Sequence, residues 1–460
     1  MLIEKYEPVN LFALVPLERD PVLDELDRLL DDDTLFAEVK ADLAQRRPQT
    51  LTRGRHSTPV EVILRMLVVK HLYNWSYAQT EHFVSDSITL RQFCRLYLQS
   101  VPDDTVVIKW ANLLQPETLQ RLLAHIVEMA RQLKVTRGRK LRTDGTVVES
   151  NIHHPTDSSL LADGVRVLSR ALGCAQDVLQ SAATDTVQVA KEVFRNRTRS
   201  ARNAARQIGR QVKKAQDRTQ RVYRKLLRIT RASVRQTRTA IQVLRETATD
   251  EAFAIVQQME HFLPLVEQVI DQTTRRVLHG EQVPVTDKVV SLFEPHTDII
   301  RRGKAGRSAE FGHKVWLDEV DGGIVSSYRV LEGNPNDLTQ WAPSLARHQE
   351  LFDRPPDQMS GDRGMYSSDN EALAQRAGVQ RVVLPKRGYR SAKRKTHERQ
   401  RWFRRGRHYH NGVEGRISVL KRRHGLARCR YHGKQGFERW VGWGIIAHNL
   451  LVIGSALAAD

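Results

Sequence analysis

The sequence predicts an α/β protein in which a long helical segment separates groups of strands. Residues 1 to about 135 carry apolar side chains at helical spacing. Residues 141–149 instead alternate and are rich in β-branched side chains, which is typical of a strand, and residues 310–320 and 324–331 are expected to form two more strands. Between them, the chain from about residue 159 to 276 is again helical in pattern and nearly free of proline. This order predicts helices first, then a sheet whose strands lie on both sides of a helical stretch.

The N-terminal segment is expected to form a compact helical bundle. Ser57-Thr58-Pro59 predicts the start of one helix, with a hydroxyl cap and proline at the first helical position. Further helices are expected from Tyr77, from Ile88 to Leu98, and after the capping group Asp103-Asp104-Thr105. Such a bundle can bind DNA, dimerise, or do both, and no recognition-helix pattern separates these options.

Asp144 lies inside the strand expected from Leu141 to Glu149. Aspartate is disfavoured within strands, so its presence there favours a chemical function. The alternative is a turn residue of an Asp144-Gly145 hairpin. The sequence leaves both interpretations open at this point.

The helical segment between the strands is strongly basic. From Arg195 to Arg245 it holds 17 Lys or Arg and a single acid, Asp217. Apolar residues recur there every three, four or seven positions, which predicts a long antiparallel helical hairpin with a thin apolar seam. Solvated faces usually mix both charge signs, so a phosphate-binding face is the favoured interpretation. Its candidate contacts are Arg206, Arg210, Lys213 and Lys214.

The C-terminal strands place a second acid at a strand end. Glu310 to Val320 and Ile324 to Leu331 are expected to pair through an Asp321-Gly322-Gly323 turn. A short strand from Gln358 to Gly361 then leads into Asp362, and Ser368 with Glu371 predicts a capping box for the next helix. Loops at the carboxyl ends of strands carry the sites of α/β sheets. Asp362 is therefore a candidate site residue.

The stretch from Arg404 to Arg423 holds one acid, Glu414, among many Lys and Arg. On a helix, Glu414, Ile417 and Lys421 fall on one face. That face offers a carboxylate for a metal ion and, two turns on, an ammonium for a phosphate. Asp144, Asp362 and Glu414 together suit two-metal phosphoryl transfer with Mg²⁺ or Mn²⁺. Spacing alone does not select them, because there are rival acids, namely Asp318, Asp321, Asp337 and Asp357.

Composition narrows the class of partner. The 460 residues carry a net charge of +20, and the pI is about 10.1. Such an excess of positive charge favours a polyanionic binding partner, and nucleic acid is favoured over an anionic membrane surface. Three scattered cysteines form neither a zinc motif nor a disulfide framework, which favours a reducing compartment. The apolar stretch from Trp440 to Ala459 is long enough to cross a bilayer, but His448 and Asn449 at its middle favour a buried core helix.

The chain resembles bacterial insertion-sequence transposases of the DDE type. The resemblance covers roughly residues 56 to 450 and is most specific in VPDDTVVIKWANLL, LRTDGTVVESNIHHPTDSSLL, EFGHKVWL, SGDRGMYS and the Glu414 helix. A Tyr, Arg, Glu, Lys signature of that group, with two, three and six residues between its members, is kept at Glu414 and Lys421. At the other two positions this sequence differs from the signature, with Arg407 in place of the Tyr and His410 in place of the Arg.

The resemblance implies an RNase H-like α/β catalytic fold with an N-terminal all-α domain and a long helical insertion. By motif position, Asp144, Asp362 and Glu414 are similar to the three acids that bind Mg²⁺ (or Mn²⁺). Lys421, His410, Arg407 and Arg416 become candidate DNA contacts, and His410 would act best when protonated, below its reference pKa of about 6.5. The implied divisions are 1–135 for DNA binding or dimerisation, 136–160 and 286–460 for the catalytic domain, and 161–285 for the basic insertion.

The implied activity is cleavage of the element's ends and joining of the 3′ hydroxyls to target DNA. The partners would be double-stranded DNA and further copies of the chain, as a dimer or larger in the DNA complex, with no membrane. The expected location is the bacterial cytoplasm, at the nucleoid. Two alternatives stay open, namely an inactive or regulatory DNA-binding protein derived from a transposase, and a related RNase H-like nuclease.

Overall fold

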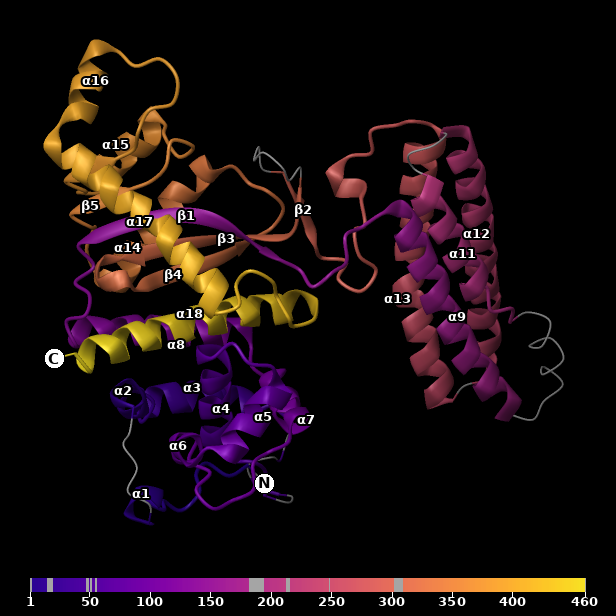
Figure 1. Cartoon of the computed structure of the whole chain (residues 1–460), viewed down its shortest axis with the longest axis horizontal. Coiled ribbons are helices and arrows are strands. Elements are labelled where there is room, and N and C mark those ends of the chain that lie inside the picture. Colours follow the sequence, from indigo (N-terminus) through magenta and orange to yellow (C-terminus); the bar gives the residue numbers. More distant parts are fainter. Residues whose placement is uncertain are drawn as a thin grey trace. The chain divides into compact units, whose positions relative to one another are not determined.

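The computed structural model describes residues 2–14, 20–46, 49, 52–53, 56–181, 194–211, 216–247, 249–301 and 309–459. The chain divides into two compact units (Figure 1). The first unit joins residues 1–151 to residues 300–460, and the second is formed by residues 152–299.

A mixed sheet forms the centre of the first unit. Its strands are β1 (Lys140–Glu149), β2 (Asp298–Ile300), β3 (Glu310–Val320), β4 (Val325–Leu331), β5 (Gln358–Ser360) and β6 (Arg381–Val383). They follow the order β2-β3-β1-β5-β6, with β4 also paired to β3. β3 is antiparallel to β1 and β4, whereas β5 and β6 continue parallel to β1. The strands expected from residues 141, 310, 324 and 358 are thus confirmed to within one or two residues at each end, and so is the β3–β4 turn.

α17 (Arg401–Arg423) and α14 (Trp341–Phe352) pack against opposite faces of β1. Side chains alternate along β1, so Arg142 and Asp144 face one side and Thr143 the other. Arg142 donates to the carbonyl of Tyr409 on α17, while the Thr143 hydroxyl lies 3.2 Å from that of Ser344 on α14. The acid-bearing face of β1 is therefore the face that α17 covers (Figure 1).

The N-terminal part is helical, as expected. Its helices are α1 (Leu11–Leu14), α2 (Pro21–Leu29), α3 (Asp33–Ala44), α4 (Val60–Leu72), α5 (Tyr77–Asp86), α6 (Ile88–Phe93), α7 (Asp104–Ala111) and α8 (Pro116–Gln132). Asp103 caps α7 as predicted, by accepting from the Val106 amide. The hydroxyl cap predicted for α4 is wrong, because Pro59 itself occupies the cap position. α6 stops at Phe93, short of Leu98, because Arg95 and Tyr97 adopt left-handed backbone angles.

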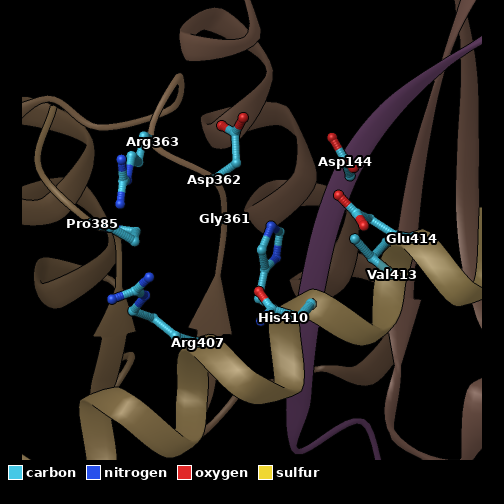
Figure 2. A pocket seen from close by; sticks show the side chains of 10 residues that line it. Asp144, Gly361, Asp362, Arg363, Pro385, Arg407, His410, Val413 and Glu414 are labelled. Carbon is cyan, nitrogen blue, oxygen red and sulfur yellow. The ribbon is translucent and has the colours of Figure 1, made fainter.

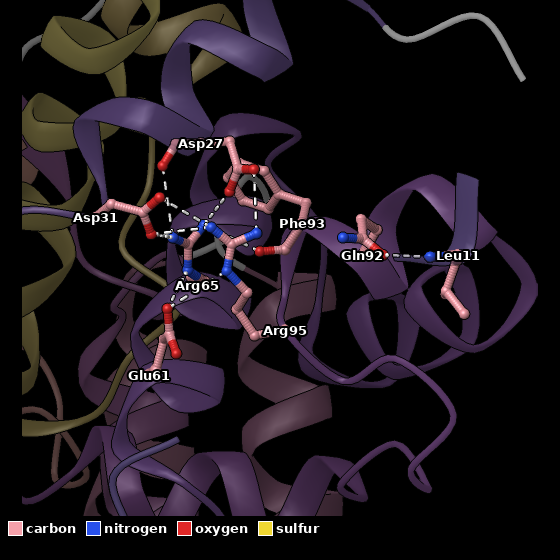
Figure 3. Close-up of polar contacts among 8 residues, drawn as sticks. All are labelled: Leu11, Asp27, Asp31, Glu61, Arg65, Gln92, Phe93 and Arg95. Carbon is pink, nitrogen blue, oxygen red and sulfur yellow. Dashed lines mark hydrogen bonds and ion pairs between the residues drawn. The ribbon is translucent and has the colours of Figure 1, made fainter. Parts of the chain in front are cut away.

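A buried ion network joins three of these helices (Figure 3). The Arg65 side chain of α4 is fully buried and bonds to Asp27 and Asp31 at 2.6 Å each and to Glu61 at 3.2 Å. It also donates to the Phe93 carbonyl at the end of α6. Arg95 shares the same three carboxylates. The network ties α2 and the end of α6 to α4.

The long apolar helix α18 (Gly433–Leu457) is the one membrane-span candidate among the described residues, by length and composition. Most of its apolar window, 72%, is buried, and it contacts α2, α4 and α8. Its central polar residues have partners: the Asn449 side chain pairs with both backbone groups of Val325, and His448 lies 3.2 Å from the Gly323 carbonyl. These contacts to the start of β4 agree with a core helix.

The remaining helices of the first unit are α15 (Ser368–Arg376) and α16 (Ala392–Arg399). The capping-box position predicted for α15 is wrong by one residue. Ser367, and not Ser368, is the N-cap, because its hydroxyl accepts from the Asn370 amide.

The second unit contains four α-helices among the described residues. They are α9 (Asp157–Ser181), α11 (Thr198–Gln211), α12 (Gln216–Thr247) and α13 (Asp250–Thr273), followed by the π-turn η1 (Thr274–Leu278) and the short 3-10 turn η2 (Val285–Asp287). The two helices expected between Arg195 and Arg245 are α11 and α12, which contact one another. Their thin apolar seam is completed by α9 and α13, whose Leu161, Leu168, Val266 and Val269 enter the same core.

Candidate active site

Strand geometry places Asp144 beside Asp362. β1 and β5 are parallel, and their last pair in register is Arg142 with Ser360. Asp144 and Asp362 each lie two residues further along, so continuing the register sets one next to the other. The sheet brings together two acids that are 218 positions apart in the sequence.

Glu414 reaches the same place because α17 lies close against the sheet. A Cβ at Gly406 would stand 2.5 Å from Val383 Cγ2 of β6, and one at Gly412 would collide with Arg142 Nη1 of β1. Both positions therefore require glycine for the helix to approach. Glu414 follows Gly412 by two residues, over β1.

A buried carboxylate fixes the rotation of α17. Glu319 of β3 is 1% exposed and accepts from Arg142 through both oxygens, at 2.6 and 2.8 Å. It also accepts from Arg416 of α17 at 3.1 Å, and Arg142 in turn donates to the Tyr409 carbonyl. Two arginines around one carboxylate thus tie β1, β3 and α17 together.

The three acids line one cavity of about 210 Å³ (Figure 2). In that view the carboxylates of Asp144 and Glu414 are turned toward one another, Asp362 stands on the facing loop, and the His410 ring lies between. The remaining lining residues are Gly361, Arg363, Pro385, Arg407, Asn411 and Val413. Asp144 and Asp362 are half-buried and Glu414 is exposed.

The Asp362 carboxylate sits in a backbone nest with other charges nearby. Its Oδ1 accepts from the amides of Gly364 at 2.7 Å and Met365 at 3.2 Å. Burial raises its pKa, and the neighbouring Asp337 adds to this, whereas the amides and Lys314 act against it. Lys314 is ion-paired with Asp337 and donates to the Pro335 carbonyl. A cation bound at Asp362 would relieve the repulsion that Asp337 imposes.

His410 lines the cavity but does not carry the charge expected of it. Burial lowers the pKa of His410 to about 4, and the nearby Arg142 adds to that shift. His410 is expected to contact phosphate best when protonated, and its lowered pKa moves that state to a more acidic pH than the reference value of about 6.5 predicts. At this position of the signature the chain presents a neutral imidazole, whose Nδ1 has no hydrogen-bond partner among the described residues.

The other predicted DNA contacts lie in different surroundings. Arg407 is exposed and lines the cavity. Lys421 lies on α17, two turns beyond Glu414 and outside the cavity lining, and Arg416 is bound to Glu319. Arg206 and Arg210 are exposed on α11 of the second unit. Lys213 and Lys214 lie outside the described residues.

The donor set fits a hard divalent cation. Carboxylate oxygens are what Mg²⁺ and Mn²⁺ prefer, and the carboxylates of β1, the loop after β5 and α17 line one cavity. Within the described ranges, no group of three or more His, Cys, Asp or Glu stands close enough to form a metal site as it is. Asp144 and Asp362 each accept a hydrogen bond from the amide of a nearby glycine, Gly145 and Gly364 respectively.

Arg363 and Asn411 are cavity residues that the sequence did not single out. Arg363 directly follows Asp362, and Asn411 follows His410. Both are direct neighbours of residues that the sequence predicted for the site, Asp362 and His410. Nothing in the sequence pattern distinguished Arg363 or Asn411 as site residues.

Comparisons with known proteins agree on one class. Residues 9–113 match a family model described as a transposase domain (DUF772), and residues 371–453 match one described as a transposase DDE domain. Glu414 falls within the second match, while Asp144 and Asp362 lie between the two. No solved structure matches the chain. Two transposase models on separate parts of the chain thus support an insertion-sequence transposase of the DDE type.

Proposed function

We propose that this transposase cleaves the ends of its own insertion sequence and joins the freed 3′ hydroxyls to target DNA by two-metal phosphoryl transfer. Asp144, Asp362 and Glu414 would hold the cations. The observation that carries the proposal is the cavity that these acids share, although they come from β1, the loop after β5 and α17. An RNase H-like catalytic domain, interrupted after β1 by the helical second unit, agrees with the mixed sheet and its parallel β1-β5-β6 part.

The chemistry divides between the cations and the protein. Bound Mg²⁺ or Mn²⁺ would activate the attacking oxygen and stabilise the leaving oxygen. The protein's own contribution is to hold the scissile phosphate. Arg363 and Arg407, both exposed at the cavity, supply positive charge for it, and Lys421 would hold a phosphate further along the strand. The neutral His410 can donate or accept a hydrogen bond there without adding charge.

The N-terminal helices and the second unit would bind DNA outside the cavity, and copies of the chain would assemble on it as a dimer or larger. The exposed Arg206 and Arg210 on α11 support backbone contact by the second unit. Such contacts set affinity and register without reading sequence. The place of action would be the bacterial cytoplasm.

The test is single-turnover cleavage of duplex DNA that carries the element's ends, with Mg²⁺. Asp144→Asn, Asp362→Asn and Glu414→Gln should each lower cleavage by more than about 100-fold. DNA binding should change little, because the phosphate contacts remain. Asp357→Asn is the matched control, since Asp357 lies just before β5 and pairs with Arg354.

Near wild-type cleavage by Asp362→Asn would shift the assignment to Asp337, the neighbouring carboxylate. DNA binding by the wild-type chain with no cleavage under any divalent cation would favour the alternative of an inactive DNA-binding derivative. His410 stands in place of the signature's arginine and burial lowers its pKa, which favours that alternative.

A further inference from the structure

An exposed ladder of aromatic rings lies at the turn between α4 and α5. The rings of Tyr73 and Trp75 stack with centroids 4.5 Å apart, and Phe83 adds a third ring 4.5 Å from Trp75. Tyr73 is 45% exposed and Phe83 38% exposed. Large aromatic side chains usually bury their ring faces in a core. Tyr73, the exposed ring at the end of this stack, instead offers surface on which another ring can stack.

The turn holds this ladder in place. Asn74 takes the left-handed backbone conformation (φ 54°), which lets the residues on either side stack. Its carbonyl accepts from Arg430 at 3.4 Å, and a Cβ at Gly425 would come within 2.7 Å of its side-chain oxygen. The ladder is thereby fixed against the loop that follows α17.

A pocket of about 500 Å³ opens beside the ladder. Tyr73 and Asn74 form one wall, and Arg422 and Arg423, both exposed at the C-terminal end of α17, form another. Its floor is apolar, with Val22, Leu23, Leu26, Leu72 and Leu451. Asp20 also lines it, with its Oδ1 accepting from the Val22 amide.

From this arrangement we infer that the pocket binds an unstacked nucleobase of the DNA strand being processed. The inference rests on the proposed function. The base would extend the aromatic ladder by stacking on Tyr73, which is how proteins commonly hold unpaired bases. Arg422 and Arg423 would hold the flanking phosphates. The apolar floor and the Asp20 carboxylate disfavour a phosphate inside the pocket, so the base and not the backbone enters.

The position along α17 agrees with this assignment. Arg422 follows Glu414 by eight residues on one continuous helix, a separation of about 12 Å. That is the length of a few nucleotide steps, at ~3.4 Å per stacked nucleotide. A strand whose scissile phosphate lies at the Glu414 cavity therefore reaches the pocket with its neighbouring nucleotides. The separation of Glu414 and Arg422 thus favours a nucleotide of the cleaved strand over a protein segment as the occupant of the pocket.

The experiment compares two DNA probes on the full-length protein. One is a blunt duplex, and the other is the same duplex with a three-nucleotide single-stranded overhang containing 2-aminopurine, whose fluorescence is quenched on stacking. The wild type should bind the overhang probe at least about tenfold more tightly and quench its fluorescence, as base–aromatic stacking predicts. Tyr73→Leu should lose the preference and the quenching, while Tyr73→Phe keeps both.

Controls separate stacking from charge and from folding. Phe253→Leu removes another aromatic residue that is 63% exposed and should leave the preference intact. Arg422→Gln and Arg423→Gln should each lower the salt dependence of overhang binding by about 0.7 in the log–log slope. Unchanged preference and quenching in Tyr73→Leu would overturn the inference. If Tyr73→Leu loses the preference for the overhang while its cleavage remains metal-dependent, the pocket is supported and the proposed function is unaffected. If the wild type does not cleave DNA, the proposed function is contradicted, but the pocket is not.

Discussion

Lys70 is a buried amine enclosed by aromatic rings. It is 2% exposed, and its Nζ lies 4.6 to 5.0 Å from the ring centres of Tyr77, Tyr431 and Trp440. Burial lowers its pKa to about 7, with Arg430 adding to the shift and Cys429 opposing it. The aromatic rings around Lys70 join the N-terminal helices to the segment that follows α17. The protonation of Lys70 is therefore coupled to the free energy of unfolding of this unit.

The sign of that coupling follows from the two pKa values. Between pH 7 and about 10.4 the unfolded chain keeps the Lys70 proton while the folded chain has lost it. The free energy of unfolding should therefore rise with pH over this window, by at most ~1.4 kcal/mol per pH unit from this residue. Urea unfolding of Lys70→Met should lack that part of the rise, and Lys109→Met, which removes an exposed lysine of the same unit, should keep it. Equal pH slopes for Lys70→Met and the wild type would contradict a deprotonated buried amine.

At the scale of elements, the spacing between α17 and the sheet decides where Glu414 stands. Gly406→Ala would press a methyl group against Val383, and overpacking of this kind costs about 1–3 kcal/mol. We expect lower thermal stability and slower cleavage, because the helix must lift away from β6. Gly415→Ala on the same helix meets nothing within 4 Å and should raise stability by up to ~1 kcal/mol without slowing cleavage. Equal effects of the two changes would mean that close approach does not position the helix.

The Arg65 network is the second element-scale feature, since it links α2 and the end of α6 to α4. Arg65→Met leaves Asp27, Asp31 and Glu61 with Arg95 as their shared partner in the network. Breaking a buried ion network in this way costs about 3–5 kcal/mol. Arg28→Met removes a 76% exposed arginine from a pair with Glu25 and should cost less than about 1 kcal/mol. Chemical unfolding measures both, and similar small losses would show that the N-terminal helices do not depend on the network.

At the scale of the whole molecule, the second unit is expected to hold DNA through its phosphates. Replacing Arg206 and Arg210 with Gln, together with Lys213 and Lys214, should weaken binding of every duplex sequence alike. It should also lower the log–log salt slope by about 0.9 for each phosphate that the variant no longer neutralises. Arg238→Gln with Arg245→Gln is the matched control, because these arginines of α12 are already paired with Glu267 and Glu260 of α13. If the salt slope of the first variant is unchanged, these four basic residues do not contact DNA phosphates and serve solubility or protein contacts instead.

The strands could be read from the sequence because local signals define them. Threonines and β-branched residues mark β1, and the Asp-Gly-Gly turn marks where β3 pairs with β4. The placement of Asp144 beside Asp362 depends on a parallel register between distant segments, which no local pattern encodes. The lowered pKa of His410 depends on its burial and on the nearby Arg142, and the four-helix second unit depends on apolar faces supplied by α9 and α13. These are properties of packing, so only the structure gives them.

The claim that Asp144, Asp362 and Glu414 form one metal site is tested most directly by counting bound cations. Electron paramagnetic resonance of Mn²⁺ titrated into the full-length protein with its DNA measures occupancy without relying on turnover. The account predicts about two tightly bound Mn²⁺ per active site. Asp144→Asn, Asp362→Asn and Glu414→Gln should each lose at least one of them, and Asp357→Asn none. Full Mn²⁺ occupancy in all three carboxylate variants would contradict the assignment.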